Sequence, residues 1–281
     1  MHRGAAGGAA GSWTAPPLEL MRIALTRPVP ESLAHCELTH QSRVPIDVAV
    51  ASAQHQQYEN ALRALGCTVR HVPAAHELPD SVFVEDVAIV LDEIAIITRP
   101  GAASRRPERN AVATVLSEYR PLVAVAGPGT LDGGDVLRIG RTLYVGLSTR
   151  TNEDGARQLS QHVSPYGYEV ECVQTAACLH LKSAVTIVDS DRVLCNPAWI
   201  DTRALRQVDV IPVDPSEPFA ANVLLLGHTI VCASSHERTA ADLRARGYSV
   251  CTVDVSELAK AEAGVTCCSL IINSSQLSAL S

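Results

Sequence analysis

The stretch FVEDVAIV, residues 83–90, places acidic side chains directly before a run of apolar and β-branched residues typical of a buried strand. The same arrangement recurs in four later stretches: TLDGGDVLRI (130–139), LHLKSAVTIV (179–188), AANVLLLGHTIV (220–231) and TCCSLII (266–272). One polar residue heads each stretch, at separations of 47, 48, 42 and 45 residues: Glu85, Asp132, His180, Asn222 and Cys267. Repeats of about 40–50 residues are typical of propellers and solenoids.

The rest of each period repeats as well. A second short strand such as EIAIITRP (93–100) is followed by a helical stretch such as NEDGARQLSQHV (152–163) and a third strand such as YEVECVQ (168–174). Gly66 and Gly247 follow two of the helices, where a capping glycine belongs. The last period stops after its first strand, and the N-terminal MRIALTRP (21–28) can supply the missing strands.

The sequence therefore predicts an α/β fold, a pseudo-fivefold α/β propeller of strand–strand–helix–strand modules around a central cavity. A closed ring fits better than a solenoid, because a solenoid needs distinct end caps. The helix of the fourth module, DTRALRQV (201–208), is short, so its local geometry stays open.

Composition restricts the class of protein. The chain has 281 residues, of which 47% are hydrophobic, and a formal net charge of −7. We expect a single domain at residues 21–281 after a loose N-terminal tail at 1–20. The charge argues against nucleic acid and favours a cationic small molecule, and no run approaches the ~18 apolar residues of a membrane span. Nine cysteines without zinc-binding spacing indicate reduced thiols in a cytoplasmic protein. The protein is either a monomer or a homodimer, and no residue decides between the two.

Closing the ring brings the polar heads and their neighbours to one cavity. They supply carboxylates, a histidine, an amide and thiols: Asp80, Glu85, Asp86, Asp132, Asp135, His180, Asn222, Cys267 and Cys268. Each has an ordinary explanation, since Asp-Gly-Gly-Asp is by default a turn and buried histidines and cysteines are commonly structural. Those explanations do not account for their shared position in the repeat, so we interpret them as one site.

Several carboxylates facing one cavity repel each other unless a cation lies between them. A metal ion is one choice, although Cys and His are softer ligands than a calcium or magnesium site takes. A guanidinium is the other, because it is planar, always charged and forms bidentate pairs with carboxylates. A thiolate at Cys267 could then attack its central carbon, with His180 serving as acid and then as base. Arg105 and Arg150 are candidates for holding an α-carboxylate, although such arginines are commonly surface charges.

Six motifs carry a resemblance to a known family: LPDSVFVEDVAIV (78–90), ITRPGAASRR (97–106), TLDGGDVL (130–137), YVGLSTRTN (144–152), LHLKS (179–183) and TCCSLII (266–272). In this order they resemble the dimethylarginine dimethylaminohydrolase family. That family belongs to the guanidino-group-modifying superfamily, together with arginine deiminase and the amidinotransferases. The resemblance extends from about residue 22 to 276, and the family fold is a pseudo-fivefold α/β propeller, in agreement with the repeat.

The resemblance implies a role for each matching residue. Cys267 matches the nucleophile and His180 the general acid and base, while Cys268 should point the other way, as strand alternation requires. Asp132 matches the acidic partner of the histidine. The remaining matches bind substrate: Asp80, Glu85 and Asp86 at the guanidinium, Arg105 and Arg150 at the α-carboxylate, and Leu38, in HCELTHQSRV (35–44), in a lid.

The implied reaction is hydrolysis of Nω,Nω-dimethyl-L-arginine or Nω-monomethyl-L-arginine to L-citrulline, through a covalent thiouronium on Cys267. It releases dimethylamine or methylamine and needs no cofactor. Zinc bound by Cys267 and His180 should inhibit. The alternatives are an arginine deiminase that releases ammonia, an amidinotransferase, a catalytically idle binding scaffold and a zinc-binding protein. The sequence does not decide the preference among dimethylated, monomethylated and unmethylated arginine.

Overall fold

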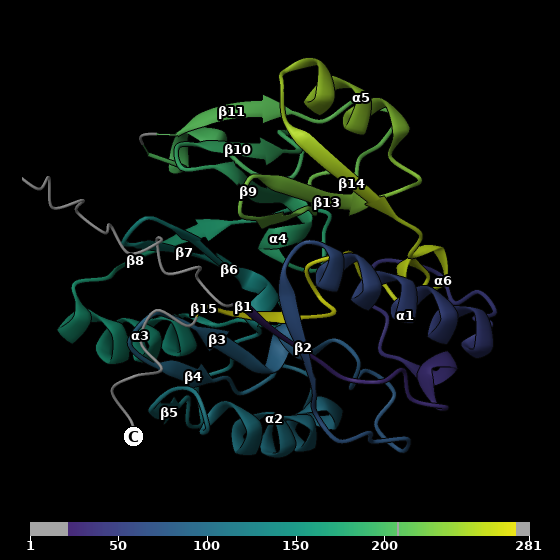
Figure 1. Cartoon of the computed structure of the whole chain (residues 1–281). Helices are drawn as coiled ribbons and strands as arrows, with labels where there is room; N and C mark the ends of the chain where they lie inside the picture. The colour runs from purple at the N-terminus through teal and green to yellow at the C-terminus, as the bar shows by residue number, and fades with distance from the viewer. Residues whose placement is uncertain (1–21, 207, 274–281) are drawn as a thin grey trace, which may run out of the picture.

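The computed structural model describes residues 22–206 and 208–273, and the tail expected at residues 1–20 lies outside them. Its strands form five three-stranded sheets, with helices α1, α2, α3 and α5 around the outside (Figure 1). The strand orders are β15-β1-β2, β3-β4-β5, β6-β7-β8, β9-β10-β11 and β12-β13-β14.

The strands are β1 (Arg22–Thr26), β2 (Cys67–His71), β3 (Ala88–Val90), β4 (Ala95–Ile97), β5 (Leu122–Ala124), β6 (Val136–Ile139), β7 (Thr142–Leu147), β8 (Glu169–Gln174), β9 (Val185–Asp189), β10 (Arg192–Cys195), β11 (Asp209–Pro212), β12 (Leu224–Leu226), β13 (Thr229–Ala233), β14 (Ser249–Val253) and β15 (Leu270–Asn273). The α-helices are α1 (Val48–Ala64), α2 (Arg109–Leu116), α3 (Glu153–Val163), α4 (Leu181–Ala184), α5 (Glu237–Ala245) and α6 (Ser256–Ala259). The 3₁₀ helices are η1 (Leu33–His35), η2 (Val84–Val87), η3 (Ala103–Glu108), η4 (Gly133–Asp135), η5 (Ser164–Tyr166) and η6 (Thr202–Ala204).

All five sheets share one pairing pattern. The first strand is antiparallel to the middle strand, and the middle strand is parallel to the third. The sheet that contains β15 takes its other two strands from the N-terminal part of the chain, with Leu25 opposite Leu270. This confirms that the N-terminal stretch completes the last module.

The helix boundaries follow from local chemistry. The Asp47 side chain accepts hydrogen bonds from the Ala49 and Val50 amides and so caps the start of α1. Gly66 and Gly247 have φ of +87° and +92°, a left-handed conformation that costs glycine little, which confirms both as capping glycines. The fourth module has only the single turn η6 where the others have a longer helix.

Apolar side chains join neighbouring sheets. The buried apolar residues form five clusters, and one of them combines Ile272 of β15, Ala88 of β3 and Val112 of α2. The sheets are therefore packed on one another through shared cores. Among the described residues, no helix is both long and apolar enough to cross a membrane.

The polar heads of the repeat lie in turns between these elements: Glu85 and Asp86 in η2, Asp132 before η4, His180 before α4, and Cys267 in a turn before β15. The expected reason for separating Cys267 from Cys268, strand alternation, is wrong because neither residue lies on a strand. Cys268 is nevertheless fully buried in a core cluster, whereas Cys267 lines a small cavity.

A channel of about 220 Å³ lies where the first strands of all five sheets meet. Its walls include Ile89 of β3, Leu137 of β6, Ile187 of β9, Leu225 of β12 and Ile271 of β15. Side chains from the polar turns also line it: Glu85, Lys182 and Thr266.

Candidate active site

Six of the nine predicted site residues line a single small cavity of about 10 Å³: Asp80, Asp86, Arg105, Arg150, His180 and Cys267. They come from four different modules, so only the closed arrangement of sheets brings them together. Glu85, Asp132 and Leu38 lie outside its lining.

Two carboxylates flank the imidazole of His180. Nε2 lies 3.1 Å from Oδ2 of Asp132, and Nδ1 lies 3.7 Å from Oδ1 of Asp86. Burial by itself lowers the pKa of His180, but Asp86, Asp132 and Asp135 outweigh it and raise the pKa to about 9. The residue is therefore an imidazolium at neutral pH and can donate a proton.

Asp132 and Asp135 hold the histidine segment in place. Asp132 also accepts a hydrogen bond from the Gly101 amide at 2.9 Å. Asp135 accepts from the Thr151 hydroxyl at 2.6 Å and from the Leu181 amide at 3.0 Å, directly after His180. Burial raises the pKa of Asp135 to about 6. Sequence reasoning placed Asp135 in the site without a role, and the structure places it beneath the histidine.

The Asp-Gly-Gly-Asp turn needs its second glycine for close packing. A Cβ on Gly134 would lie 2.7 Å from both Oδ1 of Asp86 and Nδ1 of His180. The Gly134 amide donates a hydrogen bond to Asp86 Oδ1 at 3.1 Å. The turn thus places Asp132 beside His180, and the missing side chain of Gly134 leaves room for the imidazole.

The thiol of Cys267 faces an anionic surrounding. Burial, followed by Glu85 and Asp86, raises its pKa to about 12, although the Gly264 amide donates to Sγ at 3.4 Å. Without a bound cation the thiol is therefore protonated at neutral pH.

Arg105 is buried and holds the acidic wall of the cavity. It pairs with Asp86 at 2.6 Å and with Glu108 at 2.9 Å, and Nη2 also donates to the carbonyls of Asp80 and Phe83. A guanidinium has five N–H groups. One Nη1 hydrogen is left without a partner among the described residues, so Arg105 can offer an α-carboxylate a single hydrogen bond.

Glu85 points away from the small cavity. Its carboxylate accepts from Lys182 Nζ and from the Thr266 hydroxyl, both at 2.6 Å, and it lines the channel. Its own amide donates to the Cys267 carbonyl at 3.2 Å. The predicted guanidinium ligand therefore lies behind the nucleophile, where it supports the Cys267 turn.

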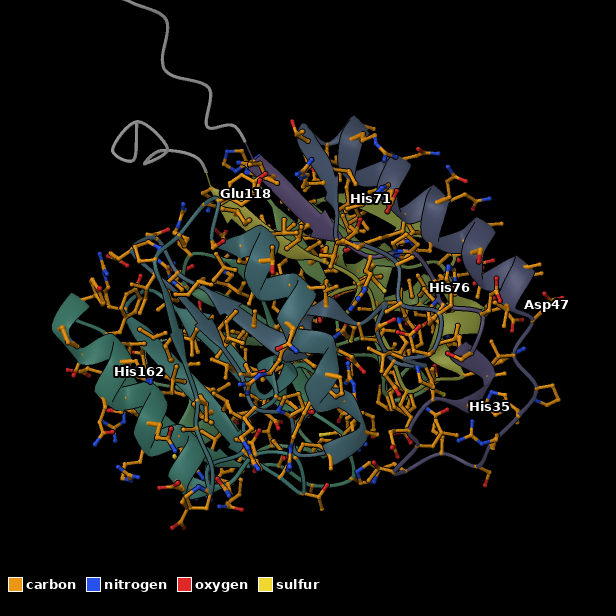
Figure 2. The ribbon with its side chains drawn as sticks, turned by 90° about the horizontal axis from the view of Figure 1, so that it is seen from below. His35, Asp47, His71, His76, Glu118 and His162 are labelled. Carbon is orange, nitrogen blue, oxygen red and sulfur yellow. The ribbon has the colours of Figure 1, made fainter. Side chains whose placement is uncertain are left out.

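The segment 36–46 covers the cavity. It runs between His35 and Asp47 at the edge of the molecule (Figure 2). Glu262, on the turn that leads to Cys267, accepts hydrogen bonds from three successive amides, those of Thr39, His40 and Gln41. Leu38, the predicted lid position, packs on a core cluster instead of lining the cavity. Sequence reasoning missed Glu262.

The same segment closes over Arg150, whose Nη2 donates to the Thr39 hydroxyl at 3.0 Å. Arg150 therefore stands at the boundary between the cavity and its cover. Of the two arginines it has the fewer partners, which suits it to bind an entering carboxylate.

Among the residues that the structure describes, one group of side chains could hold a metal ion. The ligand atoms of Asp86, Asp132 and His180 lie within 4.8 Å of one another, and all three residues are buried. The zinc pair predicted from sequence was Cys267 with His180. The structure groups His180 with two carboxylates, while inhibition by zinc at Cys267 stays a prediction.

Comparison with known proteins points to one family. The profile of the family described as arginine deiminase matches residues 72–224. Over 245 residues the chain is 42% identical to the N(G),N(G)-dimethylarginine dimethylaminohydrolase of Streptomyces coelicolor, a match that covers 87% of this chain and 94% of that protein. It is 32% identical to the protein of the same name from Pseudomonas aeruginosa, over 80% of this chain and 89% of that protein.

The fold agrees with a solved structure as well. A cysteine-to-serine mutant of the Pseudomonas aeruginosa protein, in complex with citrulline, superposes with a TM-score of 0.86 at 30% identity. The superposition covers 90% of this chain and 100% of that one.

Proposed function

The chain belongs to the dimethylarginine dimethylaminohydrolase family, and we propose that it hydrolyses Nω,Nω-dimethyl-L-arginine and Nω-monomethyl-L-arginine. The products are L-citrulline and dimethylamine or methylamine. One observation carries the proposal: a thiol, an imidazolium and two carboxylates line the same small cavity, namely Cys267, His180, Asp80 and Asp86. This reaction needs a nucleophile, a general acid and carboxylates that bind the guanidinium of the substrate.

Binding begins with charge. The carboxylates of Asp80 and Asp86 attract the guanidinium, and Arg150, with the remaining N–H of Arg105, takes the α-carboxylate. The small volume of the cavity supports a lid that must open, because about 10 Å³ has room for no more than one water molecule. We therefore propose that segment 36–46 moves aside for entry and closes again on the bound substrate.

Substrate binding also activates the nucleophile. A guanidinium beside Cys267 offsets the negative charges that raise its pKa, so on substrate binding the thiol loses its proton to solvent and the thiolate forms. Its sulfur attacks the central guanidinium carbon. The His180 imidazolium then gives its proton to the departing amine, the C–N bond breaks, and a thiouronium remains on Cys267.

The second half of the reaction reverses the role of the histidine. His180, now neutral, takes a proton from a water molecule that attacks the thiouronium carbon. The C–S bond breaks as the new hydroxyl becomes the carbonyl of citrulline, its proton passes to the leaving sulfur, and the imidazolium and thiol pair is restored. Asp132 and Asp86 stabilise the charged imidazole in each cycle.

The five sheets support the finer prediction of a pseudo-fivefold propeller. Every sheet repeats one pairing pattern, and the first strands of all five line a common channel. We propose that the reaction takes place in the small cavity, on the turns beside this channel. We also propose that the protein works in the cytoplasm and needs no cofactor.

A deiminase that converts arginine to citrulline and ammonia is the second candidate, favoured by the match to the arginine deiminase profile. Both reactions use the same cysteine, histidine and acids. They differ in what the site accepts at the terminal nitrogen.

The test is to incubate the protein separately with dimethylarginine and arginine, and to measure citrulline together with dimethylamine or ammonia. We expect citrulline with dimethylamine, and none from a Cys267→Ser variant. Citrulline from arginine alone would move the protein to the deiminase reaction with the same residues. No citrulline from either substrate contradicts both.

A further inference from the structure

Asn222, the polar head of the fourth module, lies outside the substrate cavity yet next to the nucleophile turn. It precedes β12 and is only 8% exposed. Sequence reasoning grouped it with the site because of its position in the repeat, without a role. Within the part of the chain that the structure describes, its three side-chain hydrogen bonds go to two segments that carry the proposed catalytic groups.

The side-chain amide bridges these segments. Oδ1 of Asn222 accepts from the Thr266 amide at 3.1 Å, and Nδ2 donates to the Thr266 hydroxyl at 3.0 Å. Nδ2 also donates to the Lys182 carbonyl at 3.1 Å. Thr266 directly precedes Cys267, and Lys182 lies two residues after His180.

The chemistry of the partners determines which way the amide points. The Thr266 amide can only donate and the Lys182 carbonyl can only accept. The Thr266 hydroxyl donates its hydrogen to Glu85, so toward Asn222 it must accept. All three hydrogen bonds therefore form only when Oδ1 faces the Thr266 amide and Nδ2 faces the Thr266 hydroxyl and the Lys182 carbonyl. An aspartate could form only the bond with the Thr266 amide.

Packing ties the same side chain to the loop before Cys267. A Cβ on Gly264 would lie 2.3 Å from Oδ1 of Asn222, so the loop lies directly on the amide. The Gly264 amide is the group that donates to Sγ of Cys267. Asn222 therefore contacts the nucleophile turn at two positions before Cys267, Gly264 and Thr266.

We propose that Asn222 is a positioning residue that sets the placement of Cys267 relative to His180. It acts as a clamp between the nucleophile turn and the acid–base segment and does not contact the substrate. The proposal rests on the proposed hydrolase function, because only there must thiol and imidazole act on one carbon. Buried polar groups that satisfy each other in full are rigid, which suits this role.

The experiment compares Asn222→Ala and Asn222→Asp with the wild type for kcat, KM and thermal midpoint, using dimethylarginine. We expect kcat to fall by about 10- to 100-fold, because a shift of about 1 Å at the reacting groups costs on this order. KM should stay within about threefold, since uniform substrate binding is untouched.

Asn196→Ala is the matched control. Asn196 is also buried, accepts from the Ala198 amide and donates to the Pro218 carbonyl, but neither of these hydrogen bonds goes to the turn that carries Cys267. It should lower the thermal midpoint comparably and leave kcat within about twofold. If Asn222→Ala lowers kcat no more than Asn196→Ala does, the clamp is wrong.

A second pair keeps the proposal testable if the Asn222 variants do not fold. Thr266→Ser retains all of the hydrogen-bonding groups and should keep at least about a third of the wild-type kcat, whereas Thr266→Val should reproduce the loss. Equal kcat in the two variants contradicts the clamp.

Alkylation of Cys267 separates the clamp from the substrate assignment. Iodoacetamide labelling at pH 8, read by mass spectrometry on the peptide that begins at residue 261, needs no substrate. The Gly264 and Thr266 contacts lower the pKa of Cys267, so Asn222→Ala should slow its labelling by at least about threefold. An unchanged labelling rate overturns the clamp, whereas a wild type inactive on both arginines with slowed labelling in the variant overturns only the hydrolase.

Discussion

Adjacent residues of the same turns line two different cavities. Asp86, His180 and Cys267 face the small cavity of about 10 Å³. Their near neighbours Glu85, Lys182 and Thr266 face the channel of about 220 Å³. Titratable side chains form most of the small cavity's lining, whereas strand side chains such as Ile89, Leu137 and Leu225 form most of the channel wall.

The difference between the two linings shows which part of a repeated fold carries the reactive side chains. The channel lies where five regular strands pack together, and successive residues of these strands line it, such as Ile89 and Val90 of β3. The small cavity is built where the chain leaves the strands, and turns can direct charged side chains toward a common point. The Glu85–Lys182 pair, 2.6 Å apart, lies on the channel side. Substitutions at residues that line the small cavity should therefore lower catalysis far more than substitutions at residues that line the channel.

The largest effect is expected at Cys267. Cys267→Ser should lower kcat by at least about 10⁴-fold, because the hydroxyl replaces the only thiol that faces the proposed guanidinium site among the described residues. The measurement is dimethylamine release under saturating dimethylarginine. Cys268→Ala is the control: its thiol is fully buried in the core, so it should cost about 1 kcal/mol of unfolding free energy and keep kcat within tenfold of wild type. Equal losses in the two variants would contradict the assignment.

The next effect concerns the charge of His180. Its pKa of about 9 in the folded protein lies above the ~6.5 of an unfolded histidine. The proton therefore stabilises the fold fully below pH 6.5, and that stability is lost as the pH rises through 9. The difference in unfolding free energy between wild type and His180→Gln should shrink by about 3 kcal/mol from pH 6 to pH 10. Denaturant unfolding at several pH values measures it.

His55 provides the opposite case for the same experiment. It is equally buried, but burial lowers its pKa to about 4, so its neutral form stabilises the fold. The difference between wild type and His55→Gln should therefore shrink as the pH falls from 6.5 to 4. The same sign for both histidines would show that the carboxylates around His180 do not keep it charged.

The sequence predicted the repeat, the five sheets and the gathering of six site residues in one cavity, because position within a period determines which turn a residue occupies. It did not predict which cavity each turn residue faces. Strand side chains alternate with a period of two, but a turn has no such rule, so Glu85 and Asp86 were expected to face the same way.

Other roles depended on contacts that local sequence does not carry. Glu262 reaches the cover segment across more than two hundred residues. Arg105 was expected to meet the substrate carboxylate. Its pair with Glu108 is local, three residues along η3, but its pair with Asp86 forms only once η2 and η3 are packed together. Such ion pairs are decided by tertiary packing and cannot be derived from spacing.

A smaller effect is expected on the channel side of the turns. Lys182→Met removes the cation that pairs with Glu85, whose charge raises the pKa of Cys267. Iodoacetamide labelling of Cys267 at pH 8 should then slow by about three- to tenfold, since the uncompensated carboxylate disfavours the thiolate. Glu85→Gln should accelerate it by a similar factor. Unchanged rates in both variants would mean that the channel side does not influence the nucleophile.

The smallest effect is expected inside the channel itself. Val90→Phe, on β3, adds ring atoms to a space of about 220 Å³ that has room for them, so we expect kcat and KM within about twofold and little change in the thermal midpoint. Ala263→Phe adds the same ring beside the cavity of about 10 Å³ and should abolish dimethylarginine hydrolysis, because the added atoms fill the place of the guanidinium. If Val90→Phe abolishes activity as well, the channel takes part in the reaction. The small cavity would then not be the only one of the two that serves catalysis.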